Sequence, residues 1–136
     1  MSAQTPREGS SRYAAPAGSD FTNSGAVTEP TYQIVKLNGS GQVVPSAAST
    51  DKHIGVIQNT PTSGDTADVL LINQMGTGKV QVGGAVNIGD YLTADSSGHA
   101  VATTTGGDII IGMALTAATS SPSAQVVEYL SFRAKL

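Results

Sequence analysis

Residues that could carry out chemistry are few in this chain, and their spacing fits no common reactive motif. The glycine-rich stretch from Met75 to Val80 is similar to a phosphate-binding loop. However, Asn73 stands where that loop needs its first glycine, and Val80 stands where it needs a hydroxyl group. No GxSxG sequence marks a serine nucleophile. The stretch therefore predicts a glycine-rich hairpin rather than a nucleotide site.

Potential metal ligands are scattered along the chain. His53 and His99 lie far apart and show neither HxxxH nor HExxH spacing. The acidic residues that occur in pairs are Asp65 with Asp68 and Asp90 with Asp95. These pairs lack the ladder of a calcium loop and stand where turn-forming aspartates are expected. With no cysteine in the chain, we expect no enzyme activity, no cofactor and no metal, and we expect the histidines at the surface or at strand ends.

Length and composition restrict the classes of protein that remain. The 136 residues allow one compact domain with a tail. Charged residues make up 12% and aromatic residues 4%, which fits neither a charge-rich disordered protein nor a coiled coil. The net charge of −3 gives no attraction to nucleic acid or to anionic lipid. No apolar run resembles a signal peptide or a membrane span. We therefore expect a soluble protein made in the cytoplasm, with neither nucleic acid nor membrane as a partner.

The first 30 residues differ in composition from the rest. They contain only Phe21 and Val27 among the large aliphatic and phenylalanine residues, together with three prolines. A segment with so few apolar side chains cannot offset its ordering entropy of about 1 to 2 kcal/mol per residue. The composition predicts an extended arm over residues 1–30, flexible when free, followed by a β domain over residues 31–136.

From Thr31 onward, short β-branched runs alternate with turn residues. The predicted strands are Tyr32–Leu37, Gln42–Ser46, His53–Asn59, Ala67–Asn73, Lys79–Val82, Asp90–Ala94, His99–Thr103, Asp108–Thr116 and Ala124–Phe132. The sequences NGSG from Asn38 and DSSG from Asp95 predict hairpin turns. The pattern indicates an all-β fold, a small antiparallel barrel or sandwich.

The chain also matches itself. When residues 34–72 are aligned with residues 91–129 at an offset of 57 without a gap, ten positions are identical. We interpret the match as two repeated halves that complete one barrel or sandwich. The alternative is convergence, because glycine, serine, threonine and alanine are common here and raise chance agreement.

Three short motifs follow one another in this β region. They are Gly55-Val56, then Ile88-Gly89-Asp90 and Leu92 with Gly98 and Val101, then Ile111-Gly112 and Ala114. In order and spacing they resemble the head decoration (capsid cement) proteins of tailed bacteriophages, over residues 31–131. The resemblance implies a non-enzymatic homotrimer on the outer capsid surface of a virion, which bridges subunits of the major capsid protein and stabilises the head against internal DNA pressure.

The predicted arm lies outside this resemblance, so its contacts are predicted from residue type alone. Arginine and aromatic side chains carry a large share of interface energy. We therefore expect Arg7, Arg12, Tyr13 and Phe21 to bind a partner, either capsid protein or a neighbouring protomer.

Two other functions compete with the decoration hypothesis. A head-fibre base or a carbohydrate-binding module would be expected to expose aromatic side chains, and the β domain offers only Tyr32, Tyr91, Tyr129 and Phe132. A small β-barrel enzyme or metal-binding barrel would need converging polar groups that the sequence does not indicate.

Overall fold

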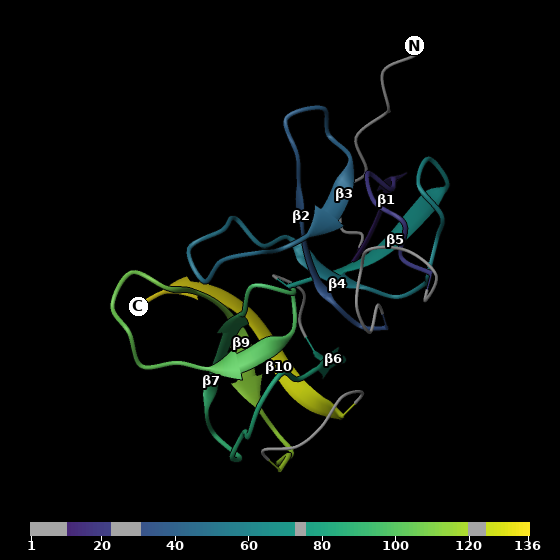
Figure 1. The fold of residues 1–136 in the computed structure, drawn as a ribbon. Coiled ribbons are helices and arrows are strands. Elements are labelled where there is room, and N and C mark those ends of the chain that lie inside the picture. Colours follow the sequence, from purple (N-terminus) through teal and green to yellow (C-terminus); the bar gives the residue numbers. More distant parts are fainter. Residues whose placement is uncertain (1–10, 23–30, 73–75, 120–124) are drawn as a thin grey trace.

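The chain folds into two five-stranded antiparallel sheets, as the computed structural model shows for residues 11–22, 31–72, 76–119 and 125–136 (Figure 1). The first sheet comprises β1 (Arg12–Pro16), β2 (Ile34–Leu37), β3 (Val43–Pro45), β4 (Gly55–Ile57) and β5 (Thr66–Leu71). The second comprises β6 (Thr77–Gln81), β7 (Tyr91–Ala94), β8 (Ala100–Ala102), β9 (Ile109–Ala114) and β10 (Val126–Lys135). The all-β prediction is confirmed, and because the two sheets stay separate the fold is a sandwich rather than a closed barrel.

Each of the nine predicted runs overlaps a strand, because β-branched residues fit a half-buried pleated surface. The strands are often shorter than the runs: the run from His53 to Asn59 narrows to the three residues of β4. Within the described ranges there is no helix, and hence none that could cross a membrane.

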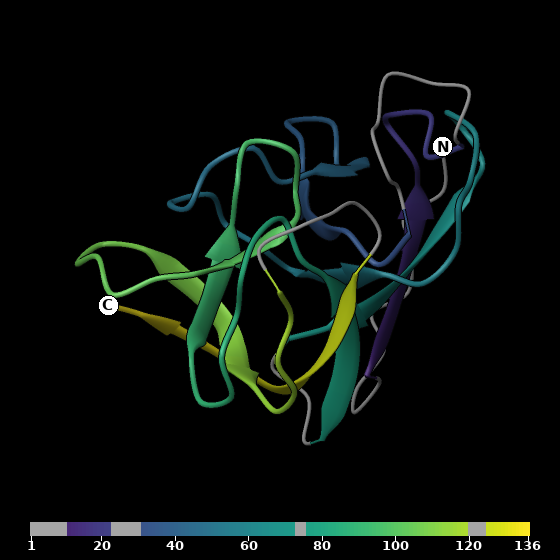
Figure 2. The ribbon, with the colours of Figure 1, turned by 60° about the horizontal axis from the view of Figure 1, so that its bottom comes forward.

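The strand β1 was not predicted, and it changes the boundary drawn at residue 30. It pairs along its whole length with β5, with Tyr13 opposite Val69 (Figure 2). Downstream of β1, Ala17 and Phe21 are fully buried. The described part of the predicted arm, residues 11–22, therefore belongs to the β domain. The low average apolar content of residues 1–30 gives no sign of this strand, because the side chains of β1 are small, half-buried or exposed.

The two sheets have the same topology. The first has the order β1-β5-β4-β2-β3 and the second the order β6-β10-β9-β7-β8, so each strand corresponds to the one five places later. Strand registers correspond as well: Ile34 pairs with Val56 in the first sheet, and Tyr91 pairs with Met113 in the second. The hypothesis of two repeated halves is confirmed in its strand order, and each repeat also includes an outer strand, β1 or β6, that the alignment left out.

The ungapped alignment is wrong in its last part. The offset of 57 holds as far as β9, because Gly55 and Gly112 occupy the same place. Gly55 pairs with Leu71, however, whereas Gly112 pairs with Ser131, which is an offset of 60. Three additional residues therefore precede β10, and the counterpart of Val69 is Tyr129 rather than Val126.

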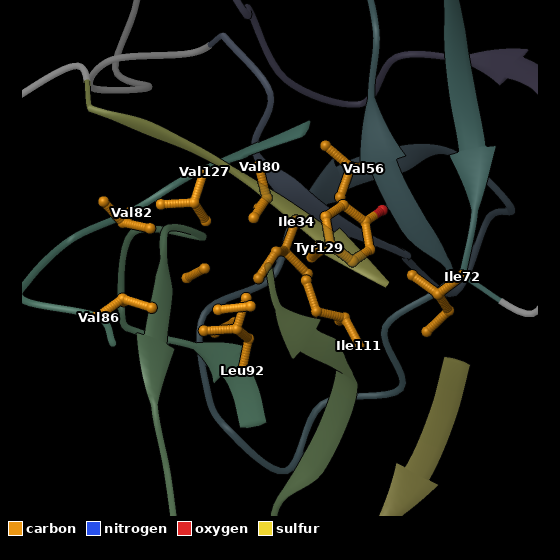
Figure 3. Close-up of a cluster of buried hydrophobic side chains, with 13 residues drawn as sticks. Ile34, Val56, Ile72, Val80, Val82, Val86, Leu92, Ile111, Val127 and Tyr129 are labelled. Carbon is orange, nitrogen blue, oxygen red and sulfur yellow. The ribbon is translucent and has the colours of Figure 1, made fainter. Parts of the chain in front are cut away.

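Buried apolar side chains form two clusters, one on each face of the first sheet. The cluster on one face contains Ala15, Ala17, Phe21, Val35, Val43, Ile57, Ala67 and Val69. The cluster between the two sheets contains Ile34 and Val56 with side chains of the second repeat, among them Leu92, Ile111 and Tyr129 (Figure 3). The first sheet is thus covered on both faces, which explains why all three residues of β4 are buried.

Backbone hydrogen bonds also join the repeats. The Ile34 amide donates to the Gly98 carbonyl over 2.8 Å, and the Ile109 amide donates to the Ser49 carbonyl over 2.9 Å. The two sheets therefore share both a core and backbone hydrogen bonds.

Candidate functional site

The residues predicted to bind a partner are not gathered on one exposed surface. Arg12 lies on β1 and forms an ion pair with Asp68, Nη1 to Oδ2 2.6 Å, with both side chains about half exposed. Tyr13 is half-buried against the Phe21 cluster, and Phe21 itself is fully buried. Phe21 as an exposed anchor is therefore wrong, because its ring fills a core. Arg7 lies outside the described residues, and a partner contact by Arg12 or Tyr13 stays a prediction.

Both histidines lie next to the start of a strand, as one of the two expected positions required, but they are buried, so the alternative of a surface position is wrong. His53 precedes β4, and its Nδ1 lies 2.8 Å from the Ser46 hydroxyl. His99 directly precedes β8, and its Nε2 lies 3.4 Å from Gln33 Nε2. Burial lowers the pKa of His53, because desolvation disfavours the imidazolium. His53 thus contributes to the polar packing near the junction of the repeats.

Acidic side chains accept hydrogen bonds from backbone amides in the turns. Asp95 Oδ1 accepts hydrogen bonds from the amides of Ser97 and His99, and Asn38 Oδ1 occupies the same place in the first repeat. Each of these turns ends in a glycine at positive φ, Gly41 at 76° and Gly98 at 79°. The two predicted hairpin turns are confirmed, and their polar residues have a structural role.

A second matched pair, Asp51 and Asp108, also accepts hydrogen bonds that hold loops. Asp51 Oδ2 accepts from the amides of Ala47 and Ala48 and from Lys36 Nζ. Asp108 accepts from the Thr103 hydroxyl over 2.5 Å. Hydrogen bonds from Ser49 and Thr103 lower the pKa of Asp108. Both carboxylates hold loops, and in the described part of the chain no three potential ligands group around a metal position.

One surface depression of about 490 Å³ lies beside the start of β10. It is lined by Asn87, Ala117, Ala118, Thr119, Gln125 and Val126. Gln125 and Thr119 bond each other across it, Nε2 to Oγ1 3.0 Å. The lining residues include no carboxylate, imidazole or ammonium group, so they supply no group for acid–base catalysis.

The most distinctive surface is the outer face of the second sheet. Leu130 on β10 pairs with Met113 on β9, which pairs with Tyr91 on β7, and directly paired residues point to the same side. Tyr91 is 43% exposed and Leu130 39%. The Phe132 ring meets the Tyr91 ring edge-on, with centroids 6.2 Å apart. We call Tyr91, Met113, Leu130 and Phe132 the apolar row.

The sequence does not reveal the apolar row, because an exposed and a buried strand face look alike when both are apolar. The repeat gives no signal for it either, since the residues at the matched places, Ile34, Val56 and Leu70, are also apolar. The exposed Ile88, at 70%, lies on the turn that leads into β7.

No family model matches this chain, and no curated protein sequence does. Among solved structures, the chain is similar to the N base of the head fibre protein gp8.5 of bacteriophage phi29, with a TM-score of 0.65 and 22% sequence identity. The alignment covers 92% of this chain and 96% of that chain. At this identity the likeness establishes a common fold, including both repeats.

Proposed function

We propose that this chain is a structural protein of a phage virion that binds the outer surface of the capsid. In this proposal it acts as a homotrimer that bridges neighbouring subunits of the major capsid protein and stabilises the head against the pressure of packaged DNA. The observation that carries the proposal is the likeness in fold, over nearly the whole of both chains, to the base of a fibre on a phage head.

The architecture suits a static binding role. The matched residues Asn38 and Asp95, and Asp51 and Asp108, hold turns and loops, and the described surface offers an apolar row instead of a cleft with titratable groups. A capsid opens at the junctions between its subunits, so a protein that spans a junction adds binding energy that must be broken first. Each protomer needs only a modest interface, about 800 Å² per partner, because a closed trimer binds at three places at once.

A second function is supported by the same fold likeness. The chain could serve as the base of a head fibre, which attaches to the head without needing to reinforce it. Both functions require binding to capsid protein, and they differ in whether binding stabilises the shell.

The test mixes the purified chain with capsids assembled without it, and measures bound copies and the temperature at which the shells open. We expect saturable binding and a higher opening temperature, because a ligand that binds only the closed shell stabilises it by about 2.7 kcal/mol per site at a hundredfold excess over Kd. Saturable binding with an unchanged opening temperature would favour the fibre base. Binding to glycans but not to capsids would contradict both.

The same assay tests the predicted role of the N-terminal residues. Removing residues 1–30 would also remove β1 and the Phe21 ring, so the informative deletion is residues 1–10, compared with Arg7→Ala and Arg12→Ala in the full chain. We expect each change to reduce capsid occupancy while circular dichroism stays that of the unaltered chain. Unchanged occupancy in all three would count against arginine anchors in this segment.

A further inference from the structure

The apolar row has a counterpart in the first repeat, and that counterpart is covered. The residues at the matching places are Ile34 for Tyr91, Val56 for Met113 and Leu70 for Leu130. Ile34 and Val56 are fully buried and pack into the core of the second repeat (Figure 3). Leu70 also lies against the second repeat, since a Cβ placed on Gly78 of β6 would lie 3.0 Å from Leu70 Cδ2. This face of the fold is therefore one on which another sheet packs.

In the second repeat the same face has no covering sheet within the described residues. Tyr91 and Leu130 keep about two-fifths of their surface exposed. A sheet face that only met water would carry polar side chains, as Lys79 and Glu128 do farther along β6 and β10. The apolar row instead keeps the chemical character of its buried counterpart.

Head-to-tail addition of further copies is blocked at the other end of the molecule. In such an assembly, the row of one copy would pack on the inner face of the first repeat of the next. That inner face is already filled by Phe21, which is fully buried. Phe21 stands where the second repeat has the smaller Val86, as matching hydrogen bonds show: the Phe21 amide donates to the Pro61 carbonyl, and the Val86 amide to the Ala118 carbonyl. An open-ended filament of copies is thus disfavoured.

We infer that the apolar row is the surface through which copies of this chain contact one another, row against row, in a closed homo-oligomer. The occupant is the same face of another copy, because the fold itself packs a sheet on this face and the head-to-tail alternative is closed by Phe21. The inference rests on the proposed function only for the number of copies: in a capsid-bridging trimer, the rows of three copies would meet around the three-fold axis.

The first test compares two leucines of nearly equal exposure. Leu130→Asp places a charge in the row, whereas Leu37→Asp places one at the end of β2, where Leu37 is 37% exposed. Molar mass is measured by light scattering at one protein concentration, with circular dichroism as the check on folding. We expect the unaltered chain and Leu37→Asp to be oligomers of equal mass, and Leu130→Asp to fall to the mass of a monomer. A monomeric unaltered chain, or a folded Leu130→Asp that keeps the oligomeric mass, would overturn the inference.

A second test does not depend on how the chain tolerates a charge. The chain contains no cysteine, so Leu130→Cys and Leu37→Cys each introduce a single thiol. Under mild oxidation we expect Leu130→Cys to form covalent dimers rapidly and Leu37→Cys to form them many times more slowly. Equal rates for the two variants would argue against a contact between rows.

These measurements use the free protein, so their failure is distinguishable from failure of the proposed function. If the chain is a monomer that nevertheless binds and stabilises capsids, the inference about the row is wrong and the function holds. If the chain forms oligomers through the row and binds no capsid, the inference holds and the proposed function is wrong.

Discussion

The hydroxyl of Tyr129 is buried between the two sheets and has no hydrogen-bond partner among the described residues. Burial raises the pKa of this phenol well above its usual range, because ionisation there would leave a charge unsolvated. The aromatic ring belongs to the hydrophobic core, where it lies among Ile34, Val56 and Leu92 (Figure 3). An unbonded buried hydroxyl costs stability, whereas the ring around it contributes packing.

This asymmetry gives a prediction for two substitutions at one position. Tyr129→Phe should leave the free energy of unfolding unchanged or raise it by about 1 kcal/mol, since it removes a desolvated polar atom and keeps the ring. Tyr129→Ala should lower it by about 3 to 5 kcal/mol, since it leaves a cavity. Urea unfolding of the three proteins measures both effects. A large loss in Tyr129→Phe would mean that the hydroxyl has a partner in solution.

His53 predicts a pH dependence of stability. Burial lowers its pKa in the folded protein below the value of 6.5 for an exposed histidine, while nearby Asp51 opposes the shift and Arg133 adds to it. Between the two pKa values the unfolded chain binds more protons than the folded chain, so stability falls as the pH falls from 6.5 towards the folded pKa.

The measurement is the free energy of unfolding at a series of pH values from 7.5 down to 5. We expect a decline below 6.5 in the unaltered chain and a flatter profile in His53→Gln, which cannot take up the proton. The carboxyl groups with lowered pKa values, among them Asp108, titrate below 3.8 and do not contribute in this range. Parallel profiles for the two proteins would show that His53 is not the group responsible.

At the scale of the strands, two matched glycines allow β4 and β9 to approach their neighbours. A Cβ on Gly55 would collide with the carbonyl oxygen of Leu70, and a Cβ on Gly112 with that of Leu130. Gly112 also has a φ of 152°, which other residues rarely adopt. Because the obstacles are backbone atoms of the paired strand, a side chain cannot be accommodated by a rotamer change.

Alanine at either position should therefore loosen a central strand pair. We expect Gly55→Ala and Gly112→Ala each to lower the free energy of unfolding by about 1 to 3 kcal/mol. Gly39→Ala is the matched control, because a Cβ at Gly39 meets nothing within 4 Å. Thermal or urea unfolding measures all three. If the control loses as much stability as the two core variants, then crowding against the paired strand is not the cause.

The strands show what the sequence could and could not predict. Nine were found because β-branched runs between turn residues are a local signal. The strand β1 was missed because its sequence, RYAAP, lacks β-branched residues, and its pairing with β5 depends on a partner far along the chain. The repeat was visible in identities such as Gly41 with Gly98. The exposure of the apolar row was not, because it depends on which sheet packs on which face.

At the scale of the whole molecule, the sharing of one core between the repeats determines how the chain unfolds. Ile34 and Val56 belong to the first sheet by their hydrogen bonds and to the core of the second repeat by their packing. If either repeat opened alone, it would expose this shared cluster and break the bonds from Ile34 and Ile109. The free energy of opening one repeat is therefore close to that of opening both.

We predict a single cooperative unfolding transition, in which a substitution in one sheet lowers the stability of both sheets equally. Val56→Ala should lower the free energy of unfolding by at least about 0.8 kcal/mol, which is the contribution of one buried methylene. Amide hydrogen exchange measured in β4 and in β10 should show the same loss in both strands. Leu37→Ala, exposed at the end of β2, should change neither strand appreciably. Slower exchange in β10 than in β4 of Val56→Ala would mean that the second repeat is stable without the first. The two repeats would then be separable domains, and the packing of Ile34 and Val56 would be a contact between them rather than a common core.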